Sequence, residues 1–361
     1  MIQYYQIQYQ YQRYFIWCIS GNPLRVIKII KHKKMTNVCS IKAREIWIDN
    51  EKGIFLFLIV LGHFGTIPKG VEWLLSPTDL LYVSAFFFLS GWLFNDDKYT
   101  KEEFFYRKFQ SLFIPYIAIS LLVSVLDWNL YLHPLQYAKD FIYRFLMGDG
   151  AAKASPLWFV STLFIANLLL KIGYVFKNRC LRSLFFISMP FLCYYLYFID
   201  VRLPLRADSA LGACFIMYMS QIVKGLSQSL CNRLLLRIVA VPLLVLGIYL
   251  KLGLLNYNSL HSVMSFPCAL GGCVSISFLM SRLLQRKIAP PIWIAQNGLP
   301  VLGFHCLISF YVDVPFKLLE VSNTDFVFVF KVVFVFSMLY FIVIPVLERI
   351  KPRWWGLTGR K

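Results

Sequence analysis

Long apolar runs separated by short charged segments make up most of the chain after about residue 46. A helix needs roughly 20 apolar residues to cross the hydrocarbon layer of a bilayer, and this criterion predicts about ten spans. Their centres lie near Ile59, Phe87, Ile119, Phe164, Phe191, Phe215, Leu244, Val274, Phe304 and Val335. The pattern therefore predicts an all-α integral membrane protein with about ten transmembrane helices.

The charged segments between these runs are not equivalent. Most of the 37 Lys and Arg residues fall before the first span, in every second connection and after the last span, whereas the alternate connections hold few. Cytoplasmic loops collect Lys and Arg. We therefore expect cytoplasmic N- and C-termini, and a multi-pass protein of the cell inner (cytoplasmic) membrane with the lipid bilayer as its partner.

Composition agrees with a membrane location and excludes several other classes. The chain is 58% hydrophobic with only 15% charged residues, which is too apolar for an ordinary soluble domain. Its net charge of +19 is spread between apolar runs without forming a polar basic surface, so no nucleic-acid partner is expected. The nine cysteines show no metal-ligand spacing. We expect reduced thiols and no metal.

The sequence predicts one membrane domain flanked by two tails. The membrane domain covers residues 41–350, and residues 351–361 form a basic cytoplasmic tail. Residues 1–40 form an N-terminal tail that begins with a Tyr/Gln-biased, low-complexity tract. Because Met35 precedes a conventional basic start, this tail is either part of the functional protein or an extension outside it.

Three ionisable residues share one face of the first predicted span. His63 follows Lys52 by eleven residues, which is three helical turns, and follows Asp49 by fourteen, close to four turns. The histidine is thus expected to be buried in the membrane, roughly 16 Å along the helix from Lys52. A titratable group at that depth indicates a functional site, where neutral imidazole can act as a general base. The alternative is a histidine that only links helices.

Five segments of the membrane domain carry recognisable motifs. They are DNEKGIFLFLIVLGH (49–63), AFFFLSGWLF (85–94), FYRKFQSLFIPY (105–116), SPLWFVSTLF (155–164) and NGLPVLGFHCLI (297–308). Each string alone is common in apolar sequence. Together, in order and spacing from about residue 46 to residue 347, they resemble the membrane acyltransferase 3 family, especially its fucose 4-O-acetylase-like branch.

The resemblance implies a membrane O-acyltransferase. Such an enzyme moves an acyl group, most often acetyl from acetyl-CoA, onto a hydroxyl of a cell-surface glycan or its lipid-linked precursor. Acetyl-CoA is then a substrate, and no bound cofactor is expected. His63 would be the catalytic residue, as a general base or as the carrier of the acyl group. Lys52, Arg107 and Lys108 would hold the coenzyme A phosphates, although positive-inside topology also explains them.

Further positions concern the acceptor. Asp49, Trp158 and His305 are the candidates for acceptor binding, although Asp49 also suits a helix N-terminus and tryptophan is common at membrane interfaces. Tyr82 begins a Tyr-Val-Ser segment where the fucose-acetylase-like branch usually has H-[MV]-P. Gln110 stands where the family has a second arginine. These differences bear on acceptor choice.

A transporter or flippase for a lipid-linked sugar is the alternative function. It would need a charged pathway through the spans. Lys331 is the one charge that we expect inside a span, and its side chain can snorkel to the membrane surface. A glycan polymerase would need a large outside loop, and the sequence predicts none.

Overall fold

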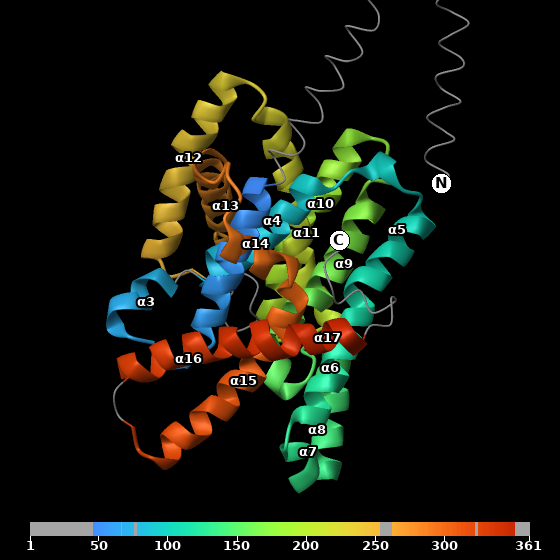
Figure 1. The fold of residues 1–361 in the computed structure, drawn as a ribbon. Helices are drawn as coiled ribbons and strands as arrows, with labels where there is room; N and C mark the ends of the chain where they lie inside the picture. The colour runs from blue at the N-terminus through green and yellow to red at the C-terminus, as the bar shows by residue number, and fades with distance from the viewer. Residues whose placement is uncertain (1–45, 66, 76–77, 253–261, 322–323, 351–361) are drawn as a thin grey trace, which may run out of the picture.

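The computed structural model describes residues 46–65, 67–75, 78–252, 262–321 and 324–350 (Figure 1). All regular secondary structure in these ranges is helical, which confirms the predicted all-α class. The two predicted tails, residues 1–40 and 351–361, lie outside the described residues.

The first described helix covers residues 46–62. The following helices make up the first half of the chain: α3 (Lys69–Leu75), α4 (Val83–Leu93), α5 (Lys101–Lys108), α6 (Ile114–Leu126), α7 (Asn129–Leu132), α8 (Pro134–Met147) and α9 (Trp158–Gly173). Those of the second half are α10 (Arg179–Phe198), α11 (Ala207–Leu226), α12 (Leu230–Tyr249), α13 (Ser265–Leu283), α14 (Ala289–Gln296), α15 (Gly298–Leu318), α16 (Thr324–Met338) and α17 (Ile344–Ile350).

Short π-helical segments continue several helices directly into the next one. Phe109–Phe113 connects α5 to α6, and Leu339–Val343 connects α16 to α17. When such joined helices are taken together, 9 helices of the described chain are long and apolar enough to cross a membrane. These correspond to nine of the predicted spans. The remaining predicted span, centred near Ile59, is the helix over residues 46–62.

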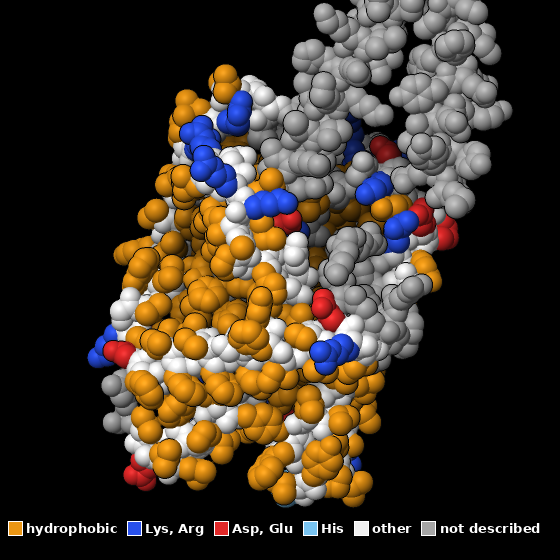
Figure 2. Space-filling model, viewed as in Figure 1, with side chains coloured by type: hydrophobic (Ala, Val, Ile, Leu, Met, Phe, Trp, Pro, Cys, Tyr) orange, Lys and Arg blue, Asp and Glu red, His pale blue; other side chains and the backbone are white. Residues whose placement is uncertain are grey.

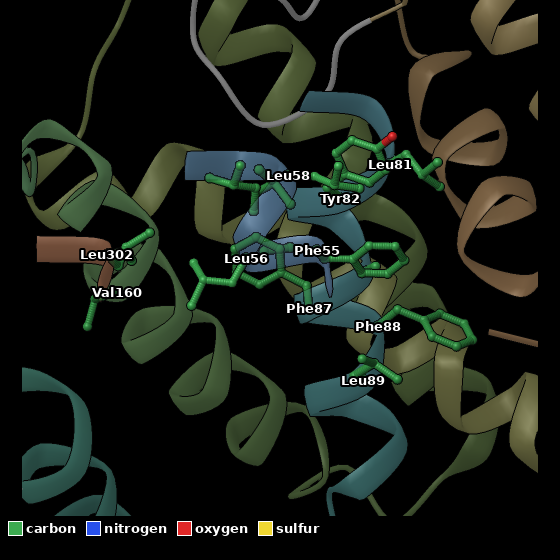
Figure 3. Packing of buried hydrophobic residues seen from close by; sticks show 14 of the residues in the cluster. Phe55, Leu56, Leu58, Leu81, Tyr82, Phe87, Phe88, Leu89, Val160 and Leu302 are labelled. Atoms are coloured by element: carbon green, nitrogen blue, oxygen red, sulfur yellow. The ribbon is translucent and has the colours of Figure 1, made fainter. Parts of the chain in front are cut away.

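The core lies where α4 meets the helix over residues 46–62 and α11. Phe87, Phe88 and Leu89 of α4 are fully buried, and Phe55 packs beside them (Figure 3). Gly91 allows α4 to approach α11 closely, because a Cβ at this position would lie 2.1 Å from the Met217 carbonyl oxygen. Gly91 of the FFFLSG segment thus serves helix packing, as small residues do in membrane bundles.

The outer surface is suited to lipid. Large hydrophobic side chains are exposed along α10, α12 and α16. Figure 2 shows a face covered mainly by hydrophobic side chains, with Lys and Arg gathered mostly toward its upper end. A continuous apolar surface of this kind is what a bilayer requires of a spanning protein.

Candidate active site

His63 lies immediately after the end of the first described helix. That helix ends at residue 62, and His63 stands in a turn in which its N–H donates to the Val60 carbonyl at 3.1 Å. Gly65 follows with a φ of 73°, a left-handed conformation that glycine adopts readily. The expectation that His63 is buried within the helix is therefore wrong: its side chain is exposed, because the chain turns before the helix can carry it into the core.

The ring of His63 is oriented by its own helix. Its Nδ1 lies 2.7 Å from the Ile59 carbonyl oxygen. Because a carbonyl can only accept, Nδ1 carries the proton, and in the neutral ring the lone pair is on Nε2. This tautomer is the one that a general base acting through Nε2 needs.

His305 lies directly against His63. The two ring centroids are 5.2 Å apart in an edge-to-face arrangement. His305 is fully buried in α15, and its Nδ1 likewise donates to a carbonyl four residues earlier, that of Val301, at 2.9 Å. His305 therefore lies behind His63, and it is not one of the residues that line the neighbouring cavity.

A cavity of about 580 Å³ extends along the first described helix. Its walls come from that helix, α4, α5, α9, α14 and α15. Five of the sequence-predicted site residues line it together: Lys52, His63, Arg107, Lys108 and Trp158. Residues separated by up to 106 positions in the sequence thus face a single space, with Lys52 and His63 near its two ends because three helical turns separate them.

Cationic side chains gather at the end of the cavity marked by Lys52. Lys98, Arg107 and Lys108 line the cavity with it. Lys52 and Lys108 interact as like charges. Arg107 is held by Glu103, whose Oε1 accepts from its Nε at 3.0 Å and from its Nη2 at 2.9 Å. Several like charges in one confined space favour a polyanion as ligand.

Asp49 does not line the cavity. It lies one turn before Lys52 on the same helix and interacts electrostatically with it. The next residues fix this end of the helix instead: Asn50 donates to the Leu284 and Arg286 carbonyls at 3.2 and 2.8 Å. Glu51 is fully buried and accepts from the Ser277 hydroxyl at 2.7 Å. The cationic end is thereby anchored to the connection that follows α13.

Trp158 has a charged neighbour that sequence reasoning missed. The guanidinium of Arg206 lies 5.7 Å from the Trp158 ring centroid, and its Nε donates to Asp149 at 2.7 Å. Arg206 is only 7% exposed although it precedes α11 in a left-handed conformation. No sequence signal links these three residues, since Asp149 follows α8, Trp158 begins α9 and Arg206 precedes α11.

Tyr82 and Gln110, the two positions that differ from the family pattern, do not line the cavity. Tyr82 is buried away from the cavity, stacked on Phe55 at 5.4 Å, and its hydroxyl donates to the Leu74 carbonyl at 2.6 Å. Gln110 donates to the Tyr106 hydroxyl at 2.7 Å. Val83, next to Tyr82, does line the cavity. Tyr82 therefore acts in packing and does not face the cavity.

Lys331 does not snorkel. It is 1% exposed in α16, and its Nζ lies 2.5 Å from Asp313 Oδ1 and donates to the Phe64 carbonyl at 2.6 Å. The expectation that Lys331 is the one charge inside a span is also wrong. Asp313 lies in α15, and the buried Glu51 lies in the helix over residues 46–62. The carboxylate compensates the lysine charge locally, so the side chain has no need to reach the surface.

The cysteines of the described chain are free thiols. Of the described cysteines, Cys193, Cys214, Cys268 and Cys273 are buried thiols. Within the described residues, no three His, Cys, Asp or Glu side chains are grouped so as to hold a metal ion.

The chain matches the model of a known protein family. A family model described as an acyltransferase domain, that of the acyltransferase 3 family, matches residues 45–357. No curated protein and no solved structure matches the chain.

Proposed function

The chain belongs to the acyltransferase 3 family and is a membrane acyltransferase, and we propose that it transfers acetyl from acetyl-CoA to a hydroxyl of a cell-surface glycan or its lipid-linked precursor. The observation that carries this proposal is the single cavity lined by both the cationic residues and His63. A donor with an anionic head and a reactive thioester tail needs these two features at opposite ends of one site.

The cationic end receives the coenzyme A phosphates in this proposal. Lys52, Arg107 and Lys108 supply charge-assisted hydrogen bonds, which are the stronger class of hydrogen bond to phosphate. The roughly 16 Å between Lys52 and His63 along the helix gives the extended pantetheine arm room to reach the histidine. By the distribution of Lys and Arg, this end faces the cytoplasm, where acetyl-CoA is made.

His63 acts as the general base. Its Nε2 takes the proton of the acceptor hydroxyl while the hydroxyl oxygen attacks the thioester carbon, forming a C–O bond. The tetrahedral intermediate then breaks its C–S bond. The proton on Nε2 passes to the departing thiolate, so the products are an acetyl ester and free coenzyme A. The bond from Nδ1 to the Ile59 carbonyl supports this role, because it keeps the lone pair on Nε2.

The acceptor sugar lies at the end of the cavity near Trp158. A flat aromatic face is a common platform for a sugar ring, and the indole N–H can donate to a hydroxyl. The guanidinium of Arg206, which pairs with Asp149, lies over the ring of this tryptophan.

The proposal is tested with membrane vesicles that contain the chain and vesicles that lack it. Both receive acetyl-CoA labelled in the acetyl group, and the polysaccharide and lipid-linked sugar fractions are then extracted. We expect alkali-labile label, which marks O-esters, only with the chain present. Absence of such label in both fractions would overturn the proposal. Transfer of unmodified lipid-linked sugar across the vesicle membrane, without label, would support the transporter alternative.

A further inference from the structure

The segment that carries His63 is tied to α15 and α16 by an ion pair whose lysine is buried. Lys331 of α16 donates to the carbonyl of Phe64, the residue directly after His63, at 2.6 Å. The same ammonium pairs with Asp313 of α15 at 2.5 Å. One side chain therefore connects three elements that are distant in the sequence.

The contact between Lys331 and Phe64 lies just beyond the end of the first helix, where helical hydrogen bonds no longer fix the backbone around His63. The helix ends at residue 62, and beyond it the turn is held by two three-residue hydrogen bonds, to the carbonyls of Val60 and Leu61. Gly65 then adds a residue of high conformational freedom. Without an external contact, the backbone on both sides of His63 would be free to shift.

Other residues of α15 and α16 also contact the turn at residues 63–65 or carry its partners. Phe64 is 1% exposed and packs edge-to-face on Phe328, one turn before Lys331 on α16. Asp313 lies eight residues after His305 on α15, about two turns along one face. The helix that places His305 against His63 therefore also carries the carboxylate that holds Lys331.

We infer that Lys331 and Asp313 are positioning residues for His63: the Asp313 carboxylate fixes the Lys331 ammonium, which holds the Phe64 carbonyl and thus sets where the His63 imidazole stands in the cavity. This inference rests on the proposed function, in which His63 is the base. It assigns a role in transfer to two charged residues that do not line the cavity.

The cost of the pair indicates that it does more than stabilise the fold. Lys331 is 1% exposed and Asp313 is 28% exposed, so the ammonium in particular is costly to remove from water, and replacing such a pair by apolar residues of similar size is often neutral or stabilising. A bundle that needed only packing at this place would be served by leucine and methionine. A charged contact that fixes the position of His63 has a different benefit, because a displacement of about 1 Å at a reacting group can lower the rate about 100-fold.

The test compares Lys331→Met, Asp313→Asn and the double variant Lys331→Met with Asp313→Leu. The double variant leaves no unpaired charge, so it separates folding from positioning. Lys317→Met, at an exposed lysine of α15, is the matched control. We expect a kcat loss of about 10- to 100-fold for both variants that lack Lys331, with KM for acetyl-CoA unchanged. Asp313→Asn, which keeps the bond to Phe64, should lose less.

Hydrogen exchange of the peptide containing residues 60–65 gives a second readout that needs no acceptor. The double variant should exchange faster there than the wild type, while the peptides of α4 and α11 stay protected. If the double variant keeps wild-type kcat and wild-type exchange at residues 60–65, the inference is overturned. If the wild type itself transfers no acetyl, the proposed function fails, and the exchange result still decides whether Lys331 fixes the turn.

Discussion

His63→Ala is expected to lower acetyl transfer by about 10²- to 10⁴-fold, the range that a positioned general base contributes. The protein should fold normally, because the His63 side chain is exposed and its hydrogen bond to the Ile59 carbonyl lies within its own helix. The measurement is release of free coenzyme A from acetyl-CoA by purified protein with acceptor present, together with the thermal midpoint in the same detergent. KM for acetyl-CoA should change little, since the proposed phosphate site lies around Lys52, away from His63.

The control for this variant is His133→Ala. His133 is exposed just before α8 and does not line the cavity, so its loss should leave the rate unchanged. A His63→Ala protein that melts like the wild type and still releases coenzyme A at the wild-type rate would remove His63 from the mechanism. His305→Ala is a poorer probe, because it would leave a hole in the core.

Removing the cations should weaken donor binding more than turnover. Lys52→Gln or Lys108→Gln is expected to raise KM for acetyl-CoA about tenfold, because a hydrogen bond to a charged group contributes about 1.5–3 kcal/mol and each 1.4 kcal/mol is tenfold. The two changes together should raise KM by about 100-fold with kcat nearly preserved. The measurement is a steady-state titration of acetyl-CoA at low and high salt, in which the wild type should lose affinity with salt more steeply than the double variant.

Lys177→Gln is the matched control for this effect. Lys177 is an exposed lysine in the connection between α9 and α10, which is predicted to be cytoplasmic, and it lies away from the cavity lining. If Lys52 and Lys108 served only membrane topology, all three variants would give the same unchanged KM. That outcome would contradict a phosphate site at this end of the cavity.

The spans and much of the cavity were predictable because they depend on local pattern. Apolar length alone located the helices, and the eleven-residue interval from Lys52 to His63 placed both on one helix face. The resemblance brought Arg107, Lys108 and Trp158 to the same site, and the structure places all five in one cavity lining. Asp49 and His305 were also proposed, but they lie beside the lining residues and do not face the cavity.

The rest depended on contacts between distant segments, which no local pattern reveals. The apolar pattern continues past residue 62 and predicts a buried His63. The helix ends at residue 62, however, and the chain turns at Gly65, so the side chain is exposed. The sequence predicts Lys331 to be a single charge within a span. Its partner Asp313 lies eighteen residues earlier, near the end of another span, so no local pattern connects the two. Pairing of this kind is set by how α15 and α16 pack, and the hydrophobic period of each helix does not encode it.

The most direct test of the account is a structure of the protein in a lipid nanodisc with a thioether analogue of acetyl-CoA that cannot be cleaved. The account predicts phosphates at Lys52, Arg107 and Lys108, and the carbon that replaces the thioester carbonyl beside His63, where a hydroxyl hydrogen-bonded to Nε2 could reach to within about 3.5 Å of that carbon. An analogue bound outside this cavity, or one whose phosphates lie beside His63 and whose acyl end lies beside Lys52, would contradict it.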